Sequence, residues 1–161
     1  MDKHICKAKD INTGEWVYGY YVAVPNEYGH DMVHLIITED CDYRGFGEFW
    51  WMDVHDVDPN TVCQCTGWCD SNKTLIFEKD IAEFVGANTY RDLICWCNEM
   101  NMMNAVPLDG IEFNGFDYLN GKYPKYDYPA FCFMMQDPYG DFKEIKVIGN
   151  IVDNPELLGL R

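Results

Sequence analysis

Residues 15–24 read Glu-Trp-Val-Tyr-Gly-Tyr-Tyr-Val-Ala-Val, and this stretch has the clearest structural preference in the 161-residue chain. Aromatic and β-branched side chains fit a pleated, half-buried strand. Pro25-Asn26 ends the segment, and Thr13-Gly14 before it has the composition of a tight turn. The pattern therefore predicts a β-hairpin near the start of the chain.

Further strand-like segments follow. Short apolar runs bounded by polar residues indicate strands at 33–38, 74–77 and 81–85, the second of them after the turn-like 70–73. Residues 130–135 and 142–148 flank a loop that contains Pro138 and Gly140, which predicts a second hairpin.

One segment, within 88–103, has helical spacing. Tyr90, Leu93, Ile94 and Cys97 fall at i, i+3, i+4 and i+7, which places them on one face of a helix. Asn88 or Thr89 can cap its start, and Asp92 lies favourably in the first turn. The spacing predicts a helix near 89–101.

The last third of the chain also contains an irregular connection and a terminal turn. Residues 104–129 hold three of the seven prolines and many tyrosines, so we expect an irregular segment there. Residues 154–158 are predicted to form a short helical turn, with Pro155 at its first position.

Together these segments predict a mainly β, or β-rich α+β, fold. We expect several hairpins forming a barrel or a sandwich, with the helix near 89–101 and the short C-terminal helical turn. We treat 1–161 as a single chain, with sub-lobes at 1–85 (the N-terminal β region) and 86–161 (the helix, the Tyr-rich insertion and the C-terminal β-hairpin) as an alternative.

Composition excludes several classes of protein. The chain has 12 Lys plus Arg against 27 Asp plus Glu, a net charge of −15, so direct nucleic-acid binding is not expected. Hydrophobic residues make up 48% of the chain, enough to fill a core. The start lacks the apolar region of a signal peptide, and no apolar run approaches 18 residues. We therefore expect a cytoplasmic protein, no membrane contact, and eight cysteines that remain thiols.

The cysteines and histidines invite a metal hypothesis. Cys63, Cys65 and Cys69 lie close together, and Cys95 and Cys97 follow, but neither pair has the C-x2-C spacing of a zinc knuckle. His30 and His34 lie in a strand-like segment, where residues four apart cannot share an ion. Buried thiols that behave as small hydrophobic groups are the favoured interpretation, with structural zinc as the alternative.

Two further patterns resemble sites and are better explained otherwise. Residues 56–60 begin like a calcium loop, yet Thr61 and Gly67 stand where the loop needs Gly and Glu, so a polar turn is the prediction. Glu144 and Lys146 have the spacing of half a nuclease site, but we expect Ile145 and Val147 to point inward and leave the charged pair on the solvent face. We predict no catalytic, cofactor-binding or metal-ligating residues, no cofactor and no enzymatic activity.

The aromatic content favours self-association. The chain has 9 Phe, 11 Tyr and 5 Trp, which make up 16% of its residues. A protein of this size cannot easily bury them all, and surplus rings are typical of subunit interfaces. A homo-oligomer is therefore expected, and a host or phage protein is a further candidate partner.

Three blocks of the chain resemble the YopX family of phage and prophage proteins. Residues 7–22 contain Gly14-Glu15-Trp16-Val17-Tyr18-Gly19, similar to the family's opening G-x-W-V-Y-G. Residues 58–81 resemble the family's central motif, and residues 147–158 resemble its closing V-I-G-N-I-x-x-N-P-E-L-L. Cys63 and Lys79 stand where the family usually has glycine, and 86–129 has no counterpart.

The resemblance implies a self-associating protein of no established activity, whose motif residues serve turns. The function we expect is therefore a non-enzymatic protein-interaction module. One alternative is an acidic nucleic-acid mimic that occupies a basic host protein. A metal-dependent enzyme is the less favoured second alternative.

Overall fold

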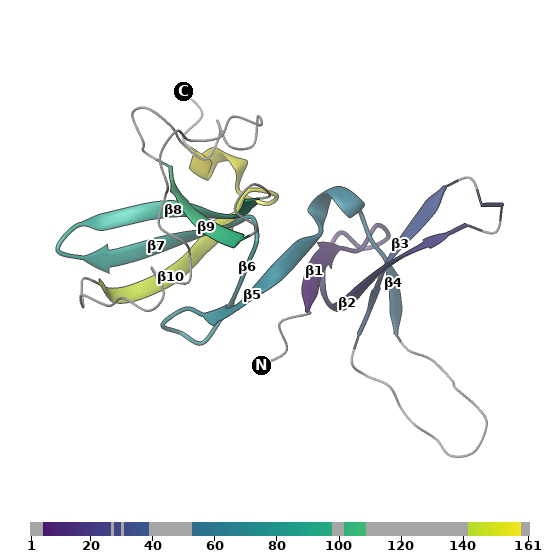
Figure 1. The fold of residues 1–161 in the computed structure, drawn as a ribbon, viewed down its shortest axis with the longest axis horizontal. Helices are drawn as coiled ribbons and strands as arrows, with labels where there is room; N and C mark the ends of the chain where they lie inside the picture. The colour runs from purple at the N-terminus through teal and green to yellow at the C-terminus, as the bar shows by residue number, and fades with distance from the viewer. Residues whose placement is uncertain are drawn as a thin grey trace, which may run out of the picture. The chain divides into compact units, whose positions relative to one another are not determined.

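The computed structural model describes residues 5–26, 28–29, 31–38, 53–97, 102–108 and 142–158, and it is built of antiparallel strands (Figure 1). The mainly β fold is thus confirmed, as two open antiparallel sheets rather than a closed barrel within the described residues. The chain forms two compact units, residues 1–65 and 66–161. The sub-lobe boundary considered at 85/86 falls inside a strand, Asp80–Gly86.

Unit 1 contains the N-terminal hairpin that the sequence predicted. Strands β1 (Cys6–Lys9) and β2 (Trp16–Pro25) pair through Lys9↔Trp16 to Cys6↔Gly19. Strand β3 (Met32–Ile37) lies on the other side of β2, and β4 (Val54–Asp56) pairs with β3. A 3-10 turn, η1 (Pro59–Thr61), precedes β5 (Cys63–Cys69), whose start pairs with β1. One face of this sheet packs around Ala8, Ile36 and Val57.

Unit 2 contains a four-stranded sheet in the order β10-β7-β8-β9. Its strands are β7 (Asp80–Gly86), β8 (Thr89–Cys97), β9 (Met102–Pro107) and β10 (Phe142–Asn150). The short β6 (Leu75–Phe77) contributes Ile76 to the core. The predicted strands at 74–77, 81–85 and 142–148 therefore match β6, β7 and β10 closely. Residues 130–135, the other arm of the predicted hairpin, lie outside the described residues.

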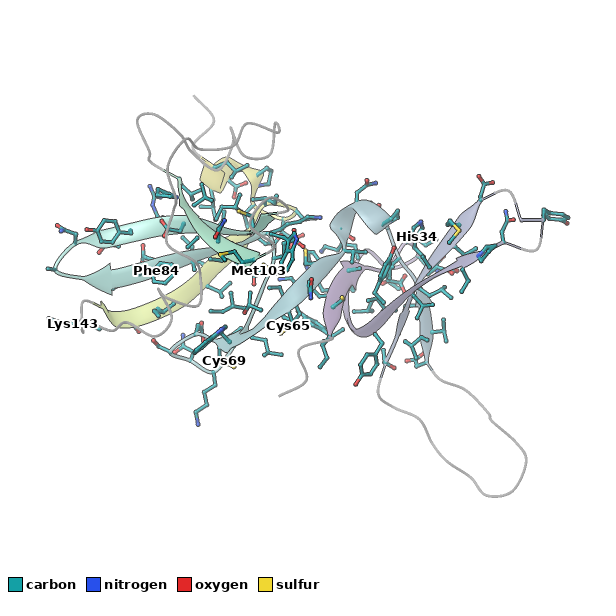
Figure 2. The ribbon with its side chains drawn as sticks, viewed as in Figure 1. His34, Cys65, Cys69, Phe84, Met103 and Lys143 are labelled. Atoms are coloured by element: carbon teal, nitrogen blue, oxygen red, sulfur yellow. The ribbon has the colours of Figure 1, made fainter. Side chains whose placement is uncertain are left out.

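Both faces of the unit 2 sheet are buried. Ile81, Leu93 and Val106 belong to one apolar cluster. Alternate positions on the same strands, Ala82, Phe84, Ile94 and Ala105, belong to another, to which Met103 adds its side chain. Figure 2 labels Phe84 and Met103 on this sheet. The strands of unit 2 therefore lack a polar face over their central residues.

The predicted helix near 89–101 is wrong. Residues 89–97 form β8, and β9 follows from 102. The cause is double burial: Asp92, Leu93, Ile94 and Cys95 are consecutive and all buried, because β8 lies between β7 and β9 with a cluster on each face. A strand buried on both faces has no period of two, so its apolar residues matched a helical spacing by coincidence.

The connection expected at 104–129 and the terminal turn have different outcomes. Residues 104–107 belong to β9, so the irregular segment was placed too early, and 109–129 lie outside the described residues. The terminal turn is confirmed as the 3-10 helix η2 (Pro155–Leu158), whose Leu158 is buried. No helix among the described residues has the length and apolar character needed to cross a membrane.

The turn before β7 depends on a lysine in a conformation that favours glycine. Lys79 has φ 67°, its amide donates to the carbonyl of Ile94 (2.7 Å), and its own carbonyl accepts from Ile151 (3.0 Å). The left-handed conformation costs a residue with a Cβ about 1–2 kcal/mol. The turn therefore keeps the geometry that glycine would adopt.

We expect Lys79→Gly to raise the free energy of unfolding by about 1 kcal/mol, because glycine reaches this φ without strain while adding entropy to the unfolded chain. Urea unfolding measures the gain. Lys143→Gly, a change of the same type at an exposed position in β10, is the control and should destabilise the protein slightly. Destabilisation by Lys79→Gly would contradict the strain argument.

Candidate functional site

One face of the unit 1 sheet exposes apolar side chains. We call it the outer face: Tyr18, Tyr20, Val22 and Val24 on β2, Val33, Leu35 and Ile37 on β3, and Val54 on β4, where the exposed Asp56 lies opposite Leu35 on the same face. The register places Tyr20, Ile37 and Val54 side by side across three strands. Tyr18 is 52% exposed, Tyr20 36% and Val54 46%. The opposite face holds the core residue Ile36, which packs with Ala8 and Val57.

Cationic side chains adjoin this face at β1. Lys7 and Lys9 alternate along β1, and their Nζ atoms lie 5.0 Å and 4.8 Å from the centre of the Trp16 ring. A cation over the face of an indole is attracted by the ring's quadrupole, and exposed examples contribute about 0.5–1 kcal/mol. The side chain of Lys7 is buried. These lysines therefore stabilise the start of β2.

An acid–histidine–acid cluster lies at the edge of the same unit. Oδ2 of the buried Asp10 lies 2.8 Å from Nδ1 of His55, and Nε2 of His55 lies 3.4 Å from Oδ2 of the exposed Asp53. Oδ1 of Asp10 accepts the amides of Asn12 and Thr13. The His55 bond and these amides lower the pKa of Asp10 to about 2, and the Asp10 bond raises the pKa of His55.

This cluster forms a structural lock within unit 1. A general base needs a ring nitrogen directed at the substrate, whereas both nitrogens of His55 face carboxylates. Asp10 meanwhile fixes the turn between β1 and β2, and its bond to His55 ties that turn to β4. The two residues are 45 apart in sequence, so no local pattern could have indicated the pair.

We expect the contribution of this lock to the free energy of unfolding to have a bell-shaped dependence on pH. The lowered pKa of Asp10 stabilises the fold above its ordinary value of 3.8, and this contribution disappears as the pH falls toward 2. The raised pKa of His55 stabilises the fold below 6.5, and this contribution is lost as the pH rises through the raised value. His55→Gln should therefore destabilise the protein most between about pH 4 and 6.5.

Urea unfolding of the wild type and of His55→Gln across this pH range measures the difference. Asp53→Asn is the control, because its carboxylate is 68% exposed and its attraction to His55 is weakened by solvent. A destabilisation by His55→Gln that is the same at pH 5 and pH 8 would count against an ionic lock.

Of the other histidines, the structure describes His34, which belongs to a packed aromatic pair. His34 lies on the core side of β3, where its Nδ1 is 2.5 Å from the hydroxyl of Tyr21 and the two rings stack at 6.0 Å (His34 is labelled in Figure 2). His4 and His30 lie outside the described residues. Tyr21 and His34 thus form a packed pair next to Ile36.

The cysteine cluster is divided along one strand. Cys63 and Cys65 are buried thiols in β5, and Cys69 is a half-buried thiol at its end (Cys65 and Cys69 are labelled in Figure 2). Cys95 is buried in the other unit's sheet. In the part of the chain that the structure describes, no three His, Cys, Asp or Glu side chains converge to hold a metal ion.

The remaining sequence patterns have structural roles. Asp58 caps η1, its Oδ1 accepting the amide of Asn60 at 2.9 Å, as expected of a polar turn. Glu144 and Lys146 form an ion pair of 2.9 Å that is about 40% exposed, and this pair raises the pKa of Lys146. Ile145 and Val147 pack into the core from the opposite face, as predicted.

Polar residues of the resemblance motifs hold turns together. Asp70 accepts the amides of Asn72 and Thr74 through Oδ1, and that of Val147 through Oδ2. Asn150 accepts the amides of Val152 and Asp153 before η2. A Cβ on Gly149 would lie 2.6 Å from Oδ1 of Asn154, so a larger residue here would displace the Asn154 side chain. These motif residues therefore specify geometry, and none of them projects a reactive group.

The sequence did not indicate that Asp92 is a buried carboxyl. Asp92 was expected in the first turn of a helix, but it lies in the centre of the unit 2 sheet at 4% exposure, and its Oδ1 has no hydrogen-bond partner. Burial raises its pKa to about 6. Oδ1 of Asn104 is also buried and without a hydrogen bond. Because residues 89–97 were predicted to form a helix, the burial of Asp92 within a sheet could not be predicted from the sequence.

Comparison with known proteins gives one family. The family model described as YopX protein matches residues 7–159, nearly the whole chain. The matched range includes both units and the blocks on which the resemblance was based. No curated protein sequence matches the chain.

Proposed function

The chain belongs to the YopX family, and from this premise we propose that it is a non-enzymatic, cytoplasmic protein of phage or prophage type that acts by self-association. The observation that carries the proposal is the outer face of unit 1. Its apolar side chains lie side by side on β2 and β3 and reach Val54 on β4, where Asp56 borders them. Tyr18, Tyr20 and Val54 are substantially exposed. Burying such a surface contributes about 25 cal/mol per Å².

The charge distribution supports a copy of the same chain as the partner. The chain carries −15 overall, yet the ten residues of β2 contain no charged side chain. Two copies that approach through β2 avoid the like-charge repulsion that most of the surface would impose. Aromatic and β-branched residues at the centre of a contact are typical of subunit interfaces.

Several observations support a non-enzymatic role. The acid–histidine cluster in unit 1 has both ring nitrogens of His55 engaged by carboxylates. Asp10, Asp70 and Asp80 accept backbone amides, which is a structural use of a buried carboxylate.

Light scattering coupled to size exclusion tests the proposal. We expect the wild type to exceed the 18.8 kDa of one chain at tens of micromolar and to dissociate on dilution. Tyr20→Ser should raise the dissociation constant about tenfold, as expected for one truncated aromatic at an interface. Tyr28→Ser is the matched control, since Tyr28 is 79% exposed but lies in the β2–β3 loop. A strict monomer at every concentration would refute self-association.

A further inference from the structure

Strand β2 is longer than the strands that pair with it. It spans ten residues, and β1 pairs with Trp16 to Gly19 on one side, whereas β3 pairs with Tyr20 to Pro25 on the other. Figure 1 shows β2 and β3 continuing together beyond β1. Among the described residues, no strand pairs with the β1 side of β2 after Gly19. We call Tyr20 to Val24 on this side the open edge.

Backbone polar groups point out along the open edge. The carbonyl of His34 accepts from Val57, so the backbone of His34 faces away from β2. In an antiparallel ladder, a residue opposite such a position also directs its N–H and C=O outward. Ala23 lies opposite His34 and Tyr21 opposite Ile36, so the backbone groups of Tyr21 and Ala23 point to the open edge.

Residues 20–24 lack two of the features that protect strand edges in monomers. Natural proteins block free strand edges with charged side chains, prolines, bulges or a covering segment. Residues 20–24 contain no charge and no proline. Pro25, which has no N–H, comes just after them and ends the strand.

We propose that a second copy of this chain pairs antiparallel with the open edge, Val22 facing Val22 across a two-fold axis. The residues at the two ends of the open edge determine this register. Gly19 is already paired with Cys6, and Pro25 ends the strand, so the outward-facing residues Tyr21 and Ala23 are centred on Val22. A two-fold contact is self-complementary by symmetry. This inference rests on the proposed self-association and names the surface that performs it.

The register satisfies every outward backbone group of the open edge. Tyr21 of each copy exchanges both hydrogen bonds with Ala23 of the other, which gives four new bonds and does not use Pro25. On the outer face, Tyr20 lies opposite Val24 of the second copy, and the two Val22 side chains meet at the axis, where a non-hydrogen-bonded pair brings Cα atoms to about 4.5 Å. Exposed outer-face residues thus become cross-strand neighbours.

Charged side chains introduced at the two-fold axis test the register. Val22→Glu and Val22→Lys each place like charges opposite each other and should each weaken association at least about tenfold. An equimolar mixture should restore association as a Glu–Lys heterodimer. Val54→Glu, the same change on the outer face but on β4, is the control and should associate like the wild type, whereas face-to-face stacking would make it dissociate.

The outcomes separate this inference from the proposed function. A wild type that is monomeric at every concentration would refute both the edge pairing and the proposed self-association. A wild type that associates while Val22→Glu associates equally, or a mixture that fails to recover, overturns the edge pairing and leaves self-association intact. Amide exchange in the wild type needs no variant: the amides of Tyr21 and Ala23 should gain at least tenfold protection in the oligomer. Equal protection in the dilute monomer would overturn the pairing.

Discussion

Gly19→Ala is expected to unfold the sheet of unit 1. A Cβ at this position would lie 2.1 Å from the carbonyl oxygen of Ile37 and 2.8 Å from its carbonyl carbon. Both are backbone atoms of β3, so no side-chain rotation relieves the overlap, and β2 and β3 must move apart. Overpacking usually costs 1–3 kcal/mol, and a backbone clash should cost about 3 kcal/mol or more. The free energy of unfolding in urea measures the loss.

Gly29→Ala is the control for this experiment. Gly29 lies in the loop between β2 and β3 with φ 69°, and no heavy atom lies within 4 Å of its added Cβ. Its cost is therefore conformational, about 1 kcal/mol. If Gly19→Ala is no more destabilising than Gly29→Ala, the close approach of β2 to β3 is not a constraint on the fold.

The prediction succeeded for β2 and failed for β8 for physical reasons. The aromatic and β-branched residues of β2 favour a strand by their composition, and Pro25 marks its end. β8 is buried on both faces, so alternation disappears and its apolar residues match other periods equally well. Burial on two faces depends on the neighbouring strands, which a local pattern does not contain.

The residues of the candidate site likewise include some that local sequence predicts and others that only strand pairing brings together. The solvent-facing positions of Glu144 and Lys146 followed from local alternation and are found as predicted. The Asp10–His55 lock joins residues 45 apart, brought together by the pairing of β3 with β4 and the bridge from Asp10 to Val57. The open edge of β2 likewise depends on where β1 begins and ends. Such features arise from register between strands, and composition does not reveal them.

The second large effect is expected at Asp92. Its side chain shares a sheet face with Ile94 and lies between Ala82 of β7 and Pro107 of β9, with Asp80 and Tyr90 as the titratable neighbours on that face. At 4% exposure and without a partner for Oδ1, the charged form is poorly solvated. Burial therefore raises the pKa from 3.8 to about 6.

The sign of the effect follows from proton binding. Between pH 3.8 and 6 the folded state holds the Asp92 proton and the unfolded state has lost it, so stability falls as the pH rises through this interval. A shift of about two units corresponds to about 3 kcal/mol, present as a penalty at pH 7 and absent at pH 3. Asp92→Asn keeps the shape of the side chain and removes the charge.

Asp92→Asn should therefore gain stability relative to the wild type as the pH rises. The stability of the variant minus that of the wild type should increase by about 3 kcal/mol between pH 3.5 and 7, which urea unfolding at four or five pH values measures. Asp31→Asn, at an exposed position before β3, should show a difference near zero throughout. If the Asp92→Asn difference does not change with pH, the carboxyl is solvated or paired in solution, and β8 is not buried on both faces there.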